Sequence, residues 1–171
     1  RLPVAEYKSQ HRGGRGVNAH KTKEEDRVTD MFVVNSHDDL MFFSNKGKMY
    51  RLRGYEIPEA GRTAKGTAIV NLLNLEGGEK ISAIIPIQNF AEGKHLLMAT
   101  KNGLIKKTPL VEYDSNRRTG LMGITLKEDD ELIDVRMTDG EDNVVLVTRQ
   151  GLCITFEEKD VRPIGRVGQG V

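Results

Sequence analysis

Three stretches of the chain share one pattern of hydrophobic and polar positions: an apolar run, a polar pair, a basic or amide residue, and a glycine. The three copies are residues 40–47, 96–103 and 144–151. A second extended run follows each glycine, at residues 48–52, 104–108 and 152–156. An apolar run that ends in a tight turn and returns is typical of a β-hairpin, and Asn102-Gly103 is the strongest form of the turn signal. The pattern therefore predicts three hairpins.

A further strand is expected before each hairpin, at residues 28–34, 81–87 and 132–137. Residues 67–75 form one more apolar run, which we expect to be extended, with a helical turn within 68–75 as the alternative. No segment carries an apolar stripe of helical period with caps at its ends. Roughly four strands in each unit of about fifty residues predict an all-β fold of propeller-like blades.

A second recurrence places an acidic residue six positions before an arginine. The four pairs are Glu6/Arg12, Glu56/Arg62, Glu112/Arg118 and Asp160/Arg166. The arginines are 50, 56 and 48 positions apart, and each opens a glycine-containing loop. We name these loop 1 (residues 10–17), loop 2 (60–67), loop 3 (116–124) and loop 4 (164–171).

Equivalent loops of a repeat array fall at the same corner of each unit, so we expect the function to lie in these four loops. A cation held beside a glycine-rich loop suits an anionic polymer, because glycine lets another backbone approach closely. The alternative is structural: Arg62, Arg118 and Arg166 would simply pair with the acid six residues before them.

The formal net charge is only +1, which by itself argues against a nucleic-acid-binding protein. The charges are, however, segregated along the chain. Acidic residues crowd into connections such as 128–131, whereas basic residues crowd into 8–15, 46–53, 101–107 and 117–118. Because equivalent turns of a repeat lie at one edge, this segregation predicts a basic band of the kind that binds nucleic acids. Ordinary solvated turns are the alternative.

Sequence signatures of catalysis and of metal binding are absent. The chain has neither a Gly-x-x-x-x-Gly-Lys-Ser/Thr phosphate loop nor a Gly-x-Ser-x-Gly nucleophile elbow. Its single cysteine, Cys153, excludes an internal disulfide and a cysteine-cluster zinc site, and we expect it to be packed within a strand. No apolar run is long enough to span a membrane. We predict no catalytic residue, no metal site and no cofactor in this chain.

Residues 10–16, Gln-His-Arg-Gly-Gly-Arg-Gly, resemble the box motif of the C-terminal domain of the DNA gyrase A protein. The resemblance covers essentially the whole chain, although His11 stands where the family usually has arginine or lysine. It implies a β-pinwheel, which is a propeller-like array of four-stranded blades. Residues 1–171 would be part of one β-pinwheel domain and form about three blades. Residues 2–7 align with 108–113, so we expect a portion of a longer array whose unpaired edge strands invite association.

The resemblance also implies a function. Domains of this family bind double-stranded DNA at the rim and wrap it positively, so that DNA gyrase, an ATP-dependent topoisomerase, introduces negative supercoils. The holoenzyme contains two gyrase A and two gyrase B proteins (A2B2) in the bacterial cytoplasm, at the nucleoid, and uses ATP and Mg on other domains or subunits. Its cleavage tyrosine lies in another domain, so this chain alone is expected to be non-catalytic.

The implied DNA-binding residues are those of the box and the equivalent cations of the other loops: Gln10, His11, Arg12, Gly13, Gly14, Arg15, Gly16, Arg62, Lys65, Arg118 and Arg166. Two alternatives stay open. The related C-terminal domain of topoisomerase IV has a degenerate or missing box. A propeller that serves as a protein-interaction scaffold would need an apolar or mixed face rather than a basic rim.

Overall fold

The computed structural model describes residues 1–16, 18, 20–91, 93–117 and 119–171. Within these ranges the chain forms strands and short 3₁₀ segments, and no α-helix. The strands are β1 (Asp39–Ser44), β2 (Lys48–Arg53), β3 (Ile81–Ile87), β4 (His95–Thr100), β5 (Ile105–Pro109), β6 (Leu121–Met122), β7 (Leu132–Thr138), β8 (Asn143–Val147) and β9 (Cys153–Glu157). The 3₁₀ segments are η1 (Val4–Glu6), η2 (Gly54–Glu56), η3 (Ile69–Asn71), η4 (Leu110–Tyr113) and η5 (Glu158–Asp160). The prediction of an all-β fold is confirmed.

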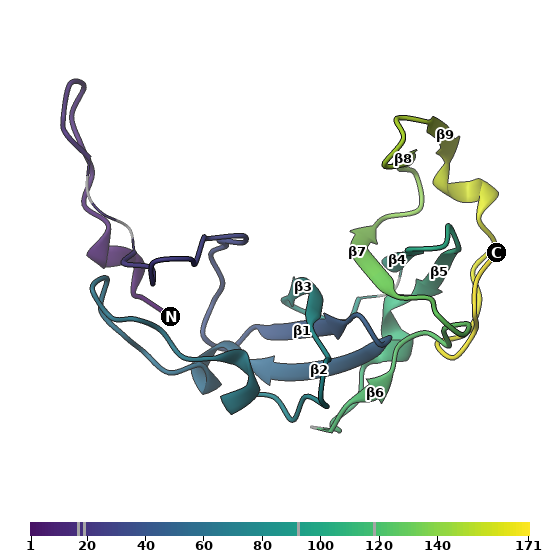
Figure 1. Ribbon diagram of the computed structural model, residues 1–171, viewed down its shortest axis with the longest axis horizontal. Helices are drawn as coiled ribbons and strands as arrows, with labels where there is room; N and C mark the ends of the chain where they lie inside the picture. Colours follow the sequence, from purple (N-terminus) through teal and green to yellow (C-terminus); the bar gives the residue numbers. More distant parts are fainter. Residues whose placement is uncertain (17, 19, 92, 118) are drawn as a thin grey trace.

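The three predicted hairpins are present: hairpin 1 (β1–β2), hairpin 2 (β4–β5) and hairpin 3 (β8–β9), all antiparallel. At their turns Gly47, Gly103 and Gly151 have φ angles of +78°, +89° and +84°. Only glycine adopts this left-handed region readily, which explains why a glycine recurs at the end of each pattern. Figure 1 shows the sheets as a curved row, with hairpin 1 in the middle and hairpin 3 beyond hairpin 2.

Later segments of the chain complete the sheets around the first two hairpins. The first sheet has the order β3-β1-β2-β6, and the second has the order β5-β4-β7. β3 and β7 each pair with the first strand of the preceding hairpin. β6 belongs to loop 3 and pairs with β2 through Lys48↔Met122 and Met49↔Leu121. In the second sheet, loop 4 takes the equivalent place, because Ile105 and Val171 exchange backbone hydrogen bonds of 2.8 and 2.9 Å.

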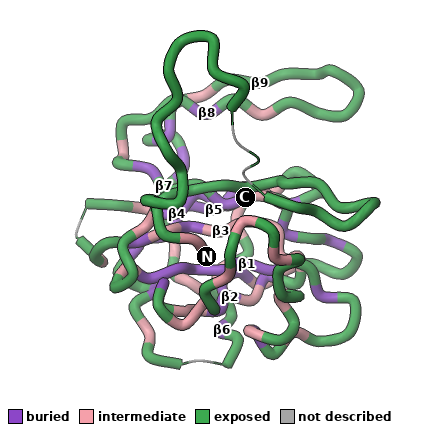
Figure 2. Tube along the Cα trace, turned by 90° about the vertical axis from the view of Figure 1, so that its left-hand side faces the viewer, coloured by how far each residue is buried: buried purple, intermediate pink, exposed green. Residues whose placement is uncertain are grey.

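The main core lies where the first two sheets meet. It includes Met41 and Phe43 of β1, Leu96 and Met98 of β4, and Tyr113 of η4. The rings of Phe43 and Tyr113 meet edge to face, with centroids 5.9 Å apart. Figure 2 shows the buried positions along these central strands, while the loops and the chain ends are exposed. Burial of these large apolar side chains is the dominant stabilising contribution, at roughly 25 cal/mol per Å² removed from water.

Two predictions about extended segments are wrong. Residues 28–34 form no strand, and Met31 and Val33 are both 79% exposed. β3 and β7 show the reason, since each pairs with a hairpin that precedes it, and no hairpin precedes 28–34 in the described chain. The run 67–75 is not extended either; it contains η3, so the alternative of a helical turn is the correct one.

Hairpin 3 differs from the other two because no further strand of the described chain flanks it. Val147 is 67% exposed and Leu152 is 69% exposed, whereas every residue of β1 is buried. Cys153 is exposed as well, so the expectation of a packed thiol is wrong. Among the described residues, no helix is long and apolar enough to cross a membrane.

Candidate nucleic-acid interface

Loop 1 carries the box in an open position. All residues from 10 to 16 are exposed, and Gly14 N donates to the carbonyl of His11 at 2.9 Å. A Cβ atom at Gly14 would lie 3.0 Å from Gln10 Oε1 and from the His11 carbonyl, so glycine allows the close turn. No ion pair or hydrogen bond from the Arg12 or Arg15 side chain occurs within the part of the chain that the structure describes. Both arginines are exposed among the described residues.

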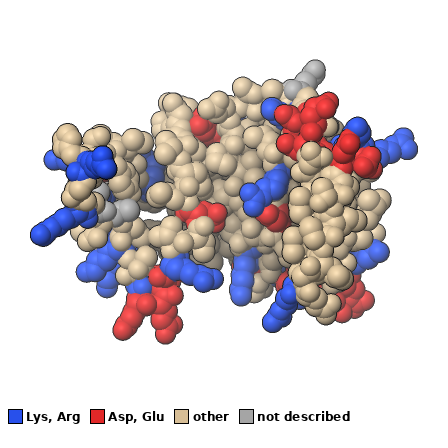
Figure 3. Space-filling model, turned by 90° about the horizontal axis from the view of Figure 1, so that it is seen from above, with Lys and Arg blue, Asp and Glu red and all other residues tan. Residues whose placement is uncertain are grey.

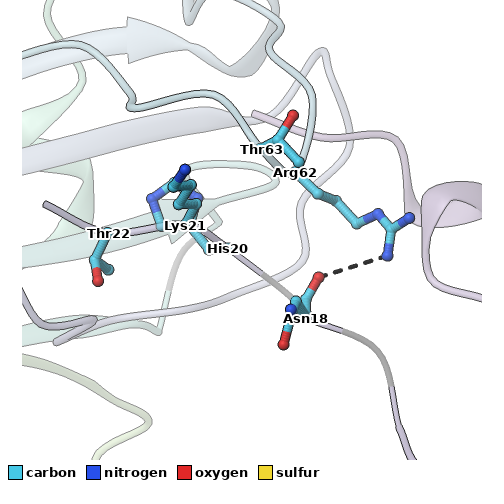
Figure 4. A pocket seen from close by; sticks show the side chains of 6 residues that line it. All are labelled: Asn18, His20, Lys21, Thr22, Arg62 and Thr63. Carbon is cyan, nitrogen blue, oxygen red and sulfur yellow. Dashed lines mark hydrogen bonds between the residues drawn. The ribbon is translucent and has the colours of Figure 1, made fainter.

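Loop 2 lies beside the segment that follows the box. Arg62 Nη1 donates to the carbonyl of Asn18 at 3.5 Å, and Lys21 N donates to the carbonyl of Arg62 at 3.1 Å. An open pocket of about 730 Å³ lies between the two segments, and its lining residues are Asn18, His20, Lys21, Thr22, Arg62 and Thr63. Figure 4 shows the Arg62 side chain directed to Asn18 across this pocket. Lys65 is exposed.

The pocket adds basic and hydroxyl groups that sequence reasoning missed. Lys21 stands nine positions after Arg12, and the same position after Arg62 is Asn71. The repeat therefore gives no signal for a cation at that place. Only the approach of loop 2 to residues 18–22 reveals it.

Loops 3 and 4 are packed against the protein, in contrast to the first two. The predicted residue Arg118 lies outside the described residues. Arg166 is half-buried; its backbone N–H donates to Glu112 Oε2 at 2.8 Å and its Nη1 donates to the carbonyl of Met122. Part of the Arg166 guanidinium is thus already used to join loop 4 to loop 3.

The recurring acids link neighbouring units where the structure describes their partners. Glu6 Oε2 lies 3.9 Å from Arg62 Nε, and Glu112 contacts the backbone of Arg166. Each acid therefore reaches the arginine of the following copy, 56 or 54 positions later. Among the described residues neither Arg62 nor Arg166 pairs with the acid six positions before it, so the structural alternative is wrong for these two arginines.

The prediction of an exposed basic band is wrong for Arg51, Lys106 and Lys107, because their side chains are largely or fully buried. Arg51 donates to both carboxylate oxygens of Asp39, at 2.9 and 2.8 Å, and to Asp114 Oδ1 at 2.9 Å. Lys107 Nζ donates to the carbonyl of Glu158 at 2.9 Å. Lys106 is 1% exposed and donates to the carbonyls of Gly123 and Arg166. These side chains hold one unit to the next and do not face solvent.

A signal for this burial existed in the repeat. Counting from the turn glycine, Lys106 is equivalent to Tyr50, and Lys107 is equivalent to Arg51. A large aromatic residue at the equivalent position indicates an interior site. Burial lowers the pKa of Lys106 to about 8, with a smaller contribution from the charge of Arg166. Burial also raises the pKa of the neighbouring Tyr113 hydroxyl above its ordinary value.

The remaining charges of both signs are spread over the surface. Figure 3 shows Lys and Arg side chains along this face with Asp and Glu side chains among them, also towards the end that carries the N-terminal segment. Exposed cations are thus found outside loops 1 and 2 as well, such as Arg136, whose side chain is 78% exposed.

One acidic cluster could in principle hold a cation. Oxygen atoms of Asp139, Asp142 and Glu158 lie within 4.8 Å of one another. Glu158 is fully buried, and its carboxylate accepts hydrogen bonds from Thr138 Oγ1 at 2.6 Å and from Gly140 N at 3.1 Å. Lys107 Nζ lies 3.8 Å away and compensates its charge. The buried Glu158 carboxylate thus stabilises the turn between β7 and β8, which accounts for the cluster without a cation.

Comparisons with known proteins agree with the repeat. A family model described as "DNA gyrase C-terminal domain, beta-propeller" matches residues 1–35, 38–88, 94–139 and 142–171. The DNA gyrase A protein of Clostridium acetobutylicum is 52% identical over 171 residues, and that of Halalkalibacterium halodurans is 53% identical over 171 residues. Both alignments cover all of this chain but only 21% and 20% of the relative, so the chain spans about a fifth of their length.

Two solved structures are similar over nearly the whole chain. The C-terminal domain of DNA topoisomerase IV gives a TM-score of 0.85 at 33% identity, covering 100% of this chain and 52% of that one. A DNA gyrase A C-terminal domain gives a TM-score of 0.71 at 28% identity, covering 98% of this chain and 54% of that one.

Proposed function

Because the chain belongs to the family of DNA gyrase C-terminal domains, we propose that it binds double-stranded DNA and wraps it along the arginine–glycine loops. The observation that carries the proposal is the box in loop 1. Its residues are exposed, and Arg12 and Arg15 have no acidic partner within the described chain. Two open guanidinium groups on a glycine turn are suited to two phosphates of a DNA backbone.

Wrapping requires many phosphate contacts along a curve rather than recognition of bases. Phosphate contacts position a protein on DNA without reading its sequence, which suits a domain that acts on any sequence. Smooth bending of a short DNA segment costs about 1–6 kcal/mol, so contacts from several units must act together. An array with one loop per unit, at spacings of 50, 56 and 48 residues, supplies such a series.

In this proposal the cations of the four loops contact phosphates: Arg12, Arg15, Arg62, Lys65, Arg118 and Arg166. Gly13, Gly14 and Gly16 shape loop 1, and Gln10 and His11 complete it. Gly13 and Gly16 support this role with φ angles of +85° and +72°. Lys21 and His20 add further groups beside Arg62. Arg166 contributes less than Arg12, because one of its nitrogens is already bonded to Met122.

A role within the whole enzyme is supported by the relatives, which are DNA gyrase A proteins. We propose that residues 1–171 form part of one β-pinwheel domain that wraps DNA positively within an A2B2 gyrase. The ATP-dependent holoenzyme then introduces negative supercoils, with ATP and Mg bound on other domains or subunits. The partners are DNA, gyrase B and a second copy of gyrase A, and the location is the bacterial cytoplasm. No catalytic residue is assigned to this chain.

A C-terminal domain of topoisomerase IV is the second candidate, and the TM-score of 0.85 favours it. The intact sequence of residues 10–16 and the identity of 52% to a gyrase A protein favour gyrase instead. The protein-interaction scaffold is a weaker candidate, supported by the exposed apolar residues of hairpin 3 and of residues 28–33.

The test closes nicked circular DNA with ligase in the presence of the chain, removes the protein and separates the topoisomers. Positive wrapping predicts an excess of positive linking difference that grows with protein concentration. The variant with Arg12→Ala and Arg15→Ala should lose most of it. Salt-sensitive binding without a linking shift would refute wrapping, and the absence of binding would refute the proposal as a whole.

A further inference from the structure

Lys106 of β5 joins two of the four arginine loops from the interior of the protein. Its side chain is almost fully buried, at 1% exposure. Its Nζ donates to the carbonyl of Gly123 in loop 3 at 2.7 Å and to the carbonyl of Arg166 in loop 4. The hydroxyl of Tyr113 lies 3.5 Å away as a third neighbour. One ammonium group thus holds two neighbouring loops to the same strand.

The groups around Lys106 reinforce this junction. Tyr113 of η4 donates its hydroxyl to the carbonyl of Gly123 at 2.9 Å. Glu112, also of η4, accepts from the backbone N–H of Arg166 at 2.8 Å, and Arg166 donates back to Met122 in loop 3. Tyr113, Glu112 and Arg166 are the titratable groups that face Lys106 from η4 and loop 4.

A buried ammonium group is a costly way to fill this site. Desolvation disfavours the charged form, and the pKa of Lys106 is lowered to about 8 by burial. The repeat shows that an uncharged residue fits the equivalent buried position, which is Tyr50 in hairpin 1, whereas the counterpart in hairpin 3, Ile154, is 59% exposed. Tyr50 packs its ring against Gly120 and donates its hydroxyl to Glu79, so it contacts loop 3 without bridging two loops. The charge at position 106 is therefore not required merely to fill the interior.

We propose that Lys106 is a positioning residue for DNA wrapping, whose ammonium group fixes loops 3 and 4 relative to each other. The inference rests on the proposed function. Each loop can hold a phosphate by itself, but DNA bends only when successive contacts lie on a rigid curve. Without the bridge, loops 3 and 4 still bind DNA, yet the spacing that imposes the curve is lost.

The first arm of the test compares Lys106→Met with Lys94→Met in the ligase-closure assay. Lys94 is exposed and lies ahead of β4, outside the loops, and its substitution removes the same charge. We expect Lys106→Met to lose most of the linking shift. Its affinity for linear DNA should change less than about threefold and its salt slope should stay unchanged, because no phosphate contact is removed. Lys94→Met should behave like the wild type in both measurements.

The second arm uses pH and needs no destabilising substitution. Between about pH 7 and about pH 9 Lys106 loses its proton, whereas Tyr113, whose pKa is raised by burial, stays protonated. The neutral amine keeps two N–H donors but loses the charge that strengthens both hydrogen bonds, so the linking shift of the wild type should fall over this range. Lys106→Arg keeps its charge throughout, so its linking shift should stay constant. A purely structural loss would lower the affinity for linear DNA together with the linking shift, whereas the positioning role lowers the linking shift alone.

The outcomes separate this inference from the proposed function. A wild type that gives no linking shift at pH 7 overturns both. A wild type that wraps, together with a Lys106→Met variant that wraps equally well, overturns the positioning role alone. Superimposable pH profiles of the wild type and Lys106→Arg overturn it too. If Lys106→Met fails to fold, as judged by circular dichroism, the pH comparison decides.

Discussion

Loops 1 and 2 carry the same recurring sequence as loops 3 and 4, but the two pairs have different surroundings. Gly66 of loop 2 and Gly170 of loop 4 occupy equivalent positions, and both have positive φ angles, of +73° and +89°. A Cβ atom at Gly66 would meet nothing within 4 Å, whereas at Gly170 it would lie 2.5 Å from the carbonyl oxygen of Ile105. One loop stands in solvent and the other is paired with a strand.

The difference shows that the repeated motif does not determine the environment of its own loop. Loop 3 follows hairpin 2 and pairs with β2 of hairpin 1. In the same way, loop 4 follows hairpin 3 and contacts β5 of hairpin 2. Each loop therefore contacts the hairpin one unit before its own. Where that earlier hairpin is present, as for loop 4, the Arg166 side chain donates a hydrogen bond to the carbonyl of Met122 within the protein. Where the described chain contains no such hairpin, Arg12, Arg15 and Lys65 face solvent. Loops 3 and 4 are thus packed against the protein, whereas the exposed cations of loops 1 and 2 are the ones to which the proposed DNA binding assigns the larger share.

The largest expected effect separates a largely buried inter-unit arginine, Arg51, from a half-buried one, Arg62. Arg51→Met leaves the buried carboxylate of Asp39 with only Arg53, at 3.3 Å, and should lower the free energy of unfolding by about 3 kcal/mol. Arg62→Met removes a more exposed pair of 3.9 Å and should cost less than about 1 kcal/mol. Urea denaturation of both variants measures the difference. Equal losses of unfolding free energy in the two variants would contradict the difference between the Arg51 and Arg62 contacts.

The glycine pair provides the next largest contrast. Gly170→Ala adds both backbone strain and a collision with Ile105, so we expect a loss of about 2–3 kcal/mol or release of loop 4 from β5. Gly66→Ala adds strain alone and should cost about 1 kcal/mol. Thermal melting gives the stability, and hydrogen exchange at Ile105 reports the release. Identical behaviour of the two variants would contradict the docking of loop 4.

A smaller effect should appear as a dependence of stability on pH. The pKa of Lys106 is lowered to about 8 in the folded chain and has a reference value of 10.5. Between these values the unfolded chain binds more protons, so stability should rise by about 1–2 kcal/mol from pH 8 to about pH 9.5. Well below pH 8 Lys106 is protonated in both the folded and the unfolded chain, so the free-energy cost of burying its charge is fully present.

Tyrosine limits this window at its upper end. Tyr50 and Tyr113 have pKa values raised by burial, so above about pH 10 they ionise mainly in the unfolded chain and stability should fall. Lys106→Met should show the fall without the preceding rise. Urea denaturation at several pH values measures both the rise and the fall of the free energy of unfolding. If the rise persisted in Lys106→Met, a group other than Lys106 would be its cause.

The sequence predicted the hairpins correctly because their signals are local. An apolar run, a glycine turn and a returning run are read within about fifteen residues, and the glycines at 47, 103 and 151 have the backbone geometry that the pattern requires. Strands 81–87 and 132–138 were predicted from their apolar runs at the same place in the repeat, and they form because each pairs with a preceding hairpin. Residues 28–34 have a similar composition but no partner hairpin, and a local pattern does not specify pairing between distant segments.

The candidate site was predictable to the extent that it lies in the motif. Residues 10–16 were identified from their sequence, and they are exposed as a ligand-binding loop requires. The burial of Lys106 and Lys107 was missed because a run of lysines is ordinarily solvated. The acid links from Glu6 to Arg62 and from Glu112 to Arg166 were missed because they cross from one unit to the next. Only the folded array brings those residues together.

The most direct test of this division is the salt dependence of DNA binding. The affinity of the wild type, of Arg12→Ala with Arg15→Ala, and of Arg166→Ala is measured for the same linear duplex at several salt concentrations. Loss of two phosphate contacts in loop 1 should reduce the slope of log affinity against log salt by about 1.8, whereas Arg166→Ala should reduce it by less than about 0.9. Equal slopes for the wild type and the loop 1 variant would contradict the claim that the exposed loop holds DNA.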